Sequence, residues 1–296
     1  HSTSRRQRQM CIRDRRMRKR KTGRQANQRR RARLLLLVSL IFLAGVAISG
    51  ILCREAAMVT DFTRSNLAPC LRYPFGTDWL GRNMFYRTLS GLSTSILIGI
   101  CAAGVSALMA LILGIAAATL GKKADSAISF LIDMVMGIPH ILLLVLISYA
   151  AGKGLRGVVI GVALTHWTSL ARLIRGEVMQ LKQREYILIA QKLGHSRLEI
   201  ARKHMLPHLL PQFVVGLVLM FPHAILHESS ITFLGFGLSS EQPAIGVILS
   251  ESMQYLIMGN WWLALFPGLM LVLTVVLFDL GGNALRSILD PNSVHE

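Results

Sequence analysis

Residues 184–207 read REYILIAQKLGHSRLEIARKHMLP, a polar and basic segment between two long apolar runs. Four apolar residues recur at helical spacing in its first half: Tyr186, Ile187, Ala190 and Leu193. This spacing predicts a helix with one apolar contact face. Gly194 allows backbone angles that other residues avoid, so it predicts a turn. A second short helix should follow and end at Leu206-Pro207. The segment thus predicts a rigid surface element, with an ordinary amphipathic helix at the membrane surface as the alternative.

The rest of the chain is dominated by long apolar blocks. Of its 296 residues, 52% are hydrophobic and 16% are charged, whereas a soluble domain carries about a quarter charged residues. Six blocks are long enough to cross a bilayer, namely 34–52, 92–120, 127–151, 155–171, 209–236 and 261–285. The sequence therefore predicts an all-α integral membrane protein with six transmembrane helices. Glycines and prolines within these blocks predict close helix packing and bends.

The distribution of Lys and Arg predicts the orientation of these helices. The 172–207 connection holds eight of them and the 237–260 connection holds none. Cytoplasmic loops carry the excess of positive charge. Four arginines also stand just before the first apolar run: Arg29, Arg30, Arg31 and Arg33. We therefore expect both termini in the cytoplasm and the 54–90 loop outside. The external 152–157 loop, with two basic residues, is a mild exception.

The net charge of +18 comes mainly from the N-terminus. Residues 1–33 hold 15 of the 33 Lys and Arg residues and one of the 15 acidic residues, so the rest of the chain carries only +4. This leader lacks interleaved aromatic residues, which disfavours nucleic acid as a partner. Residues 1–16 are interpreted as non-native sequence. The predicted organisation is a basic leader (1–33), a first helix with an external loop (34–91), a core (92–285) and a cytoplasmic tail (286–296).

The 184–207 segment resembles the EAA loop of ABC-importer permeases. In that family pattern, Ala190, Gly194, Leu206 and Pro207 match in register, while Leu188 replaces the glutamate. The sequences Arg184-Glu185-Tyr186 and His204-Met205-Leu206-Pro207 are similar to those of the peptide/nickel subclass.

Three further motifs carry the same resemblance. They are FGTDWLGRN at 75–83, SSITFLGFG at 229–237 and FPG at 266–268, followed by Asp290-Pro291. In the first, the glycines on either side of Thr77-Asp78 predict a tight turn in which Asp78 caps a short helix. Together the motifs extend the resemblance over about residues 34–292, to the second, C-type permease of dipeptide, oligopeptide and nickel importers.

The resemblance implies a function and a set of partners. It implies a six-transmembrane-helix ABC importer permease bundle with cytoplasmic coupling helices in the cell (inner or plasma) membrane. The chain would import short peptides or nickel and other metal complexes with a homologous permease, two ABC ATPase subunits and an extracytoplasmic solute-binding protein. It would be no enzyme and bind no cofactor, since it lacks a Walker A motif and ATP would bind the partner subunits. The implied ATPase-coupling residues are Glu185, Tyr186, Ala190, Gly194, Leu206 and Pro207.

A histidine-rich region gives candidate residues for the substrate pathway. His223 and His227 are four residues apart and share a helix face, Glu228 follows, and His166 lies on the fourth apolar run. Ionisable groups at membrane depth usually face a cavity or a partner. These residues are predicted to line the pathway, with metal contact or purely local hydrogen bonding as alternatives. A membrane-embedded metal-dependent enzyme and an ATPase-independent channel or transporter remain the rival functions.

Overall fold

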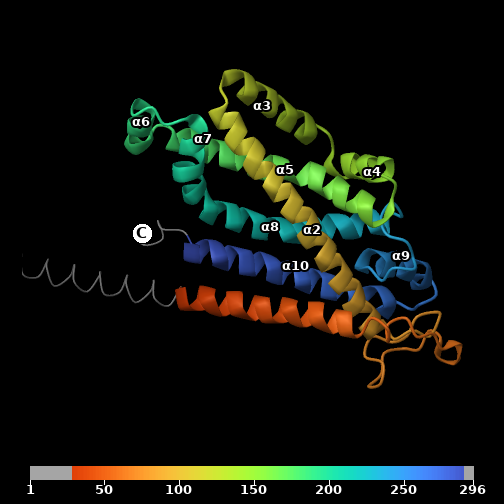
Figure 1. Ribbon diagram of the computed structural model, residues 1–296. Helices are drawn as coiled ribbons and strands as arrows, with labels where there is room; N and C mark the ends of the chain where they lie inside the picture. Colours follow the sequence, from red (N-terminus) through yellow and green to blue (C-terminus); the bar gives the residue numbers. More distant parts are fainter. Residues whose placement is uncertain (1–28, 290–296) are drawn as a thin grey trace, which may run out of the picture.

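The computed structural model describes residues 29–289, which form helices joined by loops (Figure 1). Residues 1–28 and 290–296 lie outside the described part, so the predictions for residues 1–16, for most of the basic leader and for most of the tail fall outside it. The elements are an N-terminal helix (Arg29–Leu52), η1 (Phe62–Arg64), α2 (Met84–Thr119), α3 (Lys122–Gly137), α4 (His140–Ala150), α5 (Gly154–Leu181), α6 (Glu185–Lys192), α7 (Arg197–Ile200), the π-helical turn η2 (Ala201–Met205), α8 (Leu206–Phe233), α9 (Ile245–Leu256) and α10 (Trp262–Leu289).

Most of the predicted membrane spans correspond to these helices. Within residues 29–289, five helices are long and apolar enough to cross a bilayer, and the bent pair α3 and α4 would make a sixth. The prediction that 127–151 is one continuous helix is wrong, because α3 and α4 meet at an angle of 99°. Ile138, which precedes Pro139, adopts an extended conformation with φ −91° and ψ 138°. A proline ring disfavours helical geometry in the residue before it, so the helix breaks there.

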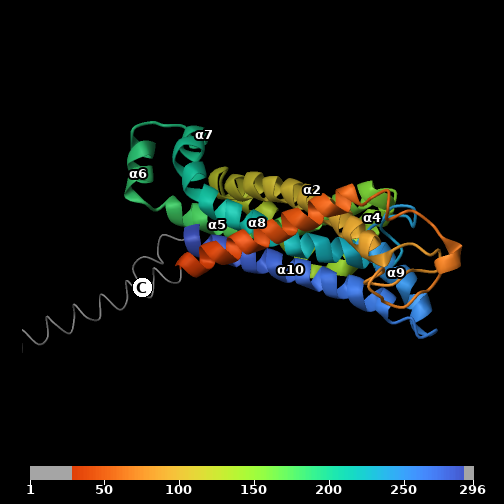
Figure 2. The same cartoon turned by 90° about the horizontal axis from the view of Figure 1, so that it is seen from below.

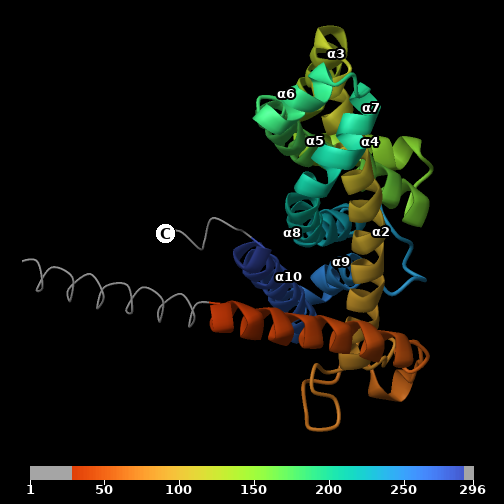
Figure 3. The same cartoon turned by 60° about the vertical axis from the view of Figure 1, so that its left-hand side comes forward.

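The long helices run side by side, and the connecting elements gather at the two ends of the bundle (Figures 1 and 2). At one end, where the N-terminal helix also starts, α6 and α7 project beyond the bundle. At the other end lie α4, α9 and the loop at 53–83. The connection predicted at 172–207 is shorter in the structure, because α5 continues to Leu181. Figure 3 shows that the N-terminal helix and α3 lie on opposite sides of the bundle.

The centre of the bundle is built on close packing between α2 and α5. A Cβ atom on Gly114 of α2 would lie 2.9 Å from the backbone oxygen of Ala171 in α5. The Ser106 hydroxyl donates a hydrogen bond to the Ala163 carbonyl across the same contact, at 3.0 Å. Because small residues let membrane helices approach each other closely, α2 can lie directly against α5. The predicted role of glycine in helix packing is confirmed at this position.

The motif at 75–83 forms a turn fixed by charges rather than a helix cap. Gly76 and Gly81 have φ values of +74° and +73°, which confirms the predicted tight turn. The prediction that Asp78 caps a helix is wrong, because the side chain of Asn83 accepts the capping hydrogen bond from the Phe85 amide at 3.0 Å. Asp78 Oδ1 instead accepts two amide hydrogen bonds inside the turn.

A buried ion network joins this turn to α2 and α9. Arg87 of α2 donates to Asp78 at 3.0 Å and to Glu251 of α9 at 2.7 Å. Arg82 pairs with the same two carboxylates, at 2.6 Å and 3.4 Å. Two positive and two negative groups therefore compensate each other where little water reaches, which attaches the loop at 53–83 firmly to the helix bundle.

The α6–α7 segment and a histidine-lined cavity

The turn at Gly194 has the geometry that the sequence predicts. Gly194 has φ +85°. Its amide donates to the Gln191 carbonyl at 3.1 Å, and the His195 amide donates to the Ala190 carbonyl at 3.2 Å. These two hydrogen bonds form a Schellman motif, which ends a helix at a residue of left-handed conformation. The chain then reverses into α7, where the Ser196 hydroxyl accepts a hydrogen bond from the Glu199 amide.

The four residues predicted to form one contact face, Tyr186, Ile187, Ala190 and Leu193, do not do so. Ile187 and Ala190 are buried, in the same core as Ile200, whereas Tyr186 is 45% exposed and Leu193 is 73% exposed. The prediction of one contact face is wrong because the buried side of α6 packs within this chain. The apolar residues left on the outer surface of α6 and α7, here called the outer apolar surface, are Tyr186, Leu188, Ile189, Leu193 and Leu198. Glu185 begins α6 and is exposed.

Leu206-Pro207 does not end the second short helix. The helix runs without a break from Arg197 to Phe233. A proline inside an α-helix collides with the carbonyl one turn earlier. The π-turn Ala201–Met205 directly precedes Pro207 and closes with a hydrogen bond from the Leu206 amide to the Ala201 carbonyl. This wider turn accommodates the proline, so α7 and α8 are joined without a break in the helix, which bends at η2 (Figure 1).

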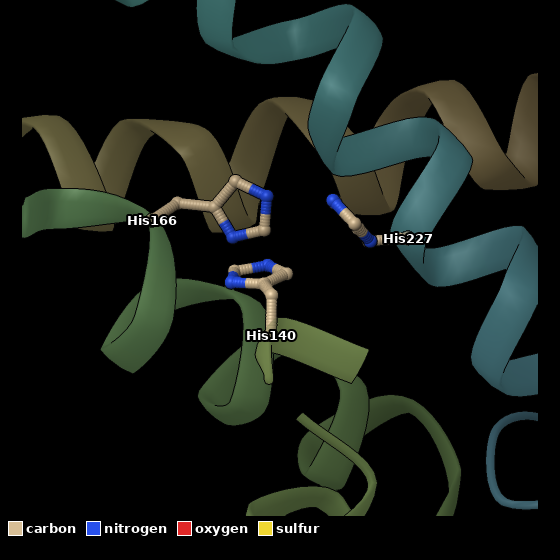
Figure 4. A group of neighbouring side chains, drawn as sticks. All are labelled: His140, His166 and His227. Carbon is tan, nitrogen blue, oxygen red and sulfur yellow. The ribbon is translucent and has the colours of Figure 1, made fainter. Parts of the chain in front are cut away.

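A cavity of about 630 Å³ lies between the α3–α4 break, α5 and α8. Four histidines line it, which are His140, His166, His223 and His227. Three of them meet, with ring centroids 4.7 Å apart for His140 and His166, 4.4 Å for His140 and His227, and 5.0 Å for His166 and His227. Figure 4 shows the three rings turned toward one another from α4, α5 and α8. His166, His223 and His227, the three histidines predicted from the sequence, therefore all line this cavity.

Glu228 does not belong to this cavity, although it follows His227 in the sequence. Its side chain is fully buried and accepts hydrogen bonds from Thr232 at 3.0 Å and from Ser229 at 3.2 Å. Successive residues of a helix point about 100° apart, so His227 and Glu228 face different neighbours. The predicted grouping of Glu228 with the three histidines is therefore wrong in this structure.

His140 is the cavity residue that the sequence interpretation missed. His140 lies inside the 127–151 run, which the sequence predicts as one continuous helix. The direction of its side chain relative to α5 and α8 could therefore not be inferred. The break at Pro139 makes His140 the first residue of α4 and turns it toward α5 and α8. The dipeptide Ile138-Pro139 was the available signal, since the residue before a proline disfavours the helix.

A family model described as "Binding-protein-dependent transport system inner membrane component" matches residues 110–294, more than half of the chain. The chain belongs to this family. The permease is 33% identical to the dipeptide transport system permease protein of Bacillus subtilis over 86% of this chain and 80% of that protein. It is 31% identical to the oligopeptide transport system permease protein of the same organism, over 87% of this chain and 84% of that protein. The predicted resemblance to this group of permeases is confirmed.

The fold of the permease also has a solved counterpart. The inward-facing MetNI methionine ABC transporter matches with a TM-score of 0.58 and 17% identity, over 70% of this chain and 98% of that chain. At this identity the match shows the fold alone. The predicted fold class, a helical ABC importer permease bundle in a multi-pass membrane protein, is confirmed.

Proposed function

We propose that this chain is the C-type permease of an ATP-driven importer, paired with a homologous permease and two ATPase subunits and supplied by an extracytoplasmic binding protein. The observation that carries this proposal is the projecting α6–Gly194–α7 segment with its outer apolar surface. Relatives of this chain include permeases of dipeptide and oligopeptide transport systems, which supports short peptides as cargo. The same similarity favours transport over a membrane-embedded enzyme.

The outer apolar surface supports a docking role because it lies on a rigid element. Exposed apolar groups clustered on one projecting segment are typical of an interaction site. The buried residues Ile187 and Ile200 hold both short helices in the core. The flanking basic residues support a cytoplasmic position for this end of the bundle. We assign the outer apolar surface to the contact with an ATPase subunit.

The continuous helix Arg197–Phe233 supports a mechanism for coupling. Leu198 lies on the outer apolar surface, and His223, 25 positions later, lines the cavity. At a rise of 1.5 Å per residue the helical path between the two positions is about 38 Å long. A continuous helix of this kind can carry a displacement of its docked end to the cavity wall. Closure of the ATPase dimer on ATP would thereby change access to the cavity, which we assign to the substrate pathway.

Charge on the outer apolar surface is expected to weaken assembly. The double substitution Leu193→Asp and Leu198→Asp should sharply reduce the amount of ATPase subunit that co-purifies with the permease, because carboxylates would have to lose water in an apolar contact. Ile257→Asp is the matched control, since Ile257 is 94% exposed and lies beyond α9 at the opposite end of the bundle. Equal co-purification of the two variants would refute the assignment, and cargo flux from the reconstituted chain without ATPase would favour a channel.

A further inference from the structure

We propose that His140, His166 and His227 form a binding site for a divalent transition-metal ion of the late first row, so that the cargo includes metal ions held by a small chelator. This inference rests on the proposed transport function and names the cargo chemistry of its pathway. One nitrogen of each of the three imidazoles lies within 4.8 Å of the other two. Tetrahedral ligands at 2.0–2.1 Å from a metal stand about 3.3 Å apart. Side-chain rotations that move the ligand nitrogens by about an ångström would bring all three to bonding distance from one ion.

Two of the imidazoles have a nitrogen that the protein leaves without a partner. His140 Nε2 and His166 Nε2 are buried, and neither has a hydrogen-bond partner. A buried polar atom without a partner costs free energy, and a bound water or ion is one of the causes for which a native structure keeps such an atom. Both atoms belong to rings that line the same cavity. Metal coordination would satisfy both at once.

The orientation of His166 is that of a metal ligand. Its Nδ1 lies 3.0 Å from the Val162 carbonyl one turn earlier on α5. Nδ1 also lies 3.1 Å from the Thr165 hydroxyl, which donates its own proton to the Gly161 carbonyl at 3.0 Å. Both neighbours of Nδ1 therefore act as acceptors, so Nδ1 carries the proton and donates it. The lone pair is therefore on Nε2, the atom without a partner. A metal-ligating histidine almost always donates its other ring N–H in this way, which fixes the tautomer and the direction of the ring.

The composition and size of the cavity indicate how the metal arrives. Imidazole ligands suit Ni²⁺, Cu²⁺ and Zn²⁺, and the residues that line the cavity include no Asp or Glu, the ligands that Mg²⁺ and Ca²⁺ prefer. Three neutral ligands leave the charge of the ion uncompensated. His140 also begins α4, where the helix dipole favours an anion. A volume of about 630 Å³ far exceeds the roughly 30 Å³ that one water occupies. The site thus fits an ion with its own anionic chelator, and a short peptide with a free carboxylate is one such chelator.

Nickel binding to the purified importer tests this site. The permease, with its partner subunits in lipid nanodiscs, is dialysed against Ni²⁺ alone, Ni²⁺ with glycylglycine, and glycylglycine alone, and bound metal is measured. We expect His140→Gln, His166→Gln and His227→Gln each to weaken Ni²⁺ binding at least tenfold. X-ray absorption of the wild-type complex should show imidazole nitrogen ligands. His208→Gln is the matched control, because His208 is an exposed residue of the same helix α8 and should leave binding unchanged.

Two results would overturn the metal site. One is unchanged Ni²⁺ affinity in all three variants, and the other is an absorption spectrum without imidazole ligands. ATP hydrolysis and co-purification of the ATPase subunits are measured on the same samples. If these persist while specific Ni²⁺ binding is absent, the metal site fails and the importer function stands. If the ATPase never associates with the wild-type chain, the proposed function itself fails.

Discussion

Gly194→Val is expected to abolish ATP-driven uptake while the permease still inserts into the membrane. Gly194 has φ +85°, and a Cβ atom there would meet nothing within 4 Å. The substitution therefore acts through the backbone alone. A left-handed conformation costs a residue with a Cβ atom about 1–2 kcal/mol. The Schellman turn would relax and tilt α6 away from α7, so the outer apolar surface would no longer fit its partner. Uptake and ATP hydrolysis in the same membrane vesicles measure the loss of coupling.

Gly259→Val separates this effect from general backbone strain. Gly259 has φ +87° and equally open surroundings, but it lies between α9 and α10 at the opposite end of the bundle (Figure 1). We expect this variant to keep uptake coupled to ATP hydrolysis. Normal uptake by Gly194→Val, or equal losses in both variants, would contradict a coupling role for the turn.

Arg87→Met is expected to cause the largest loss of stability. The substitution leaves the carboxylates of Asp78 and Glu251 with only Arg82 to compensate them. Removal of one partner from a buried ion network costs about 3–5 kcal/mol, because an uncompensated charge stays buried. The midpoint of thermal unfolding in detergent should fall by several degrees or more. The 53–83 loop should also become a preferred site of limited proteolysis.

Arg172→Met is the control for this prediction. Arg172 pairs with Asp133 at 2.7 Å, but both side chains are more than half exposed. An exposed pair contributes about 0–1 kcal/mol, so its loss should barely change the unfolding midpoint. If the Arg87 and Arg172 variants unfold at the same temperature, the network around Asp78 does not stabilise the loop at 53–83.

Features with a local cause could be predicted from the sequence. The long apolar runs predicted the membrane helices, because a bilayer sets a minimum length of apolar chain. Gly194 predicted a turn because its φ angle is a property of one residue. The shared helix face of His223 and His227 followed from helical periodicity, and both line the cavity.

Features that depend on distant packing could not be predicted. The burial of Ile187 and the exposure of Tyr186 are set by the neighbouring helices, which the pattern of α6 alone does not reveal. Arg87 and Glu251 are 164 positions apart, so nothing local joins them. Pro207 looked like a helix stop, but the preceding π-turn accommodates it. His140 joined the histidines only because the chain bends by 99° just before it.

Photo-cross-linking at Leu198 tests the central claim most directly. A photoreactive residue is placed at this position, which is 79% exposed at the projecting end, and in a second sample at Ile257 at the opposite end. The importer is irradiated in native membranes and the products are identified by mass spectrometry. We predict a cross-link from position 198 to an ATP-hydrolysing subunit and none from position 257. A cross-link from position 198 to an extracytoplasmic protein, or an ATPase cross-link from position 257, would contradict the account.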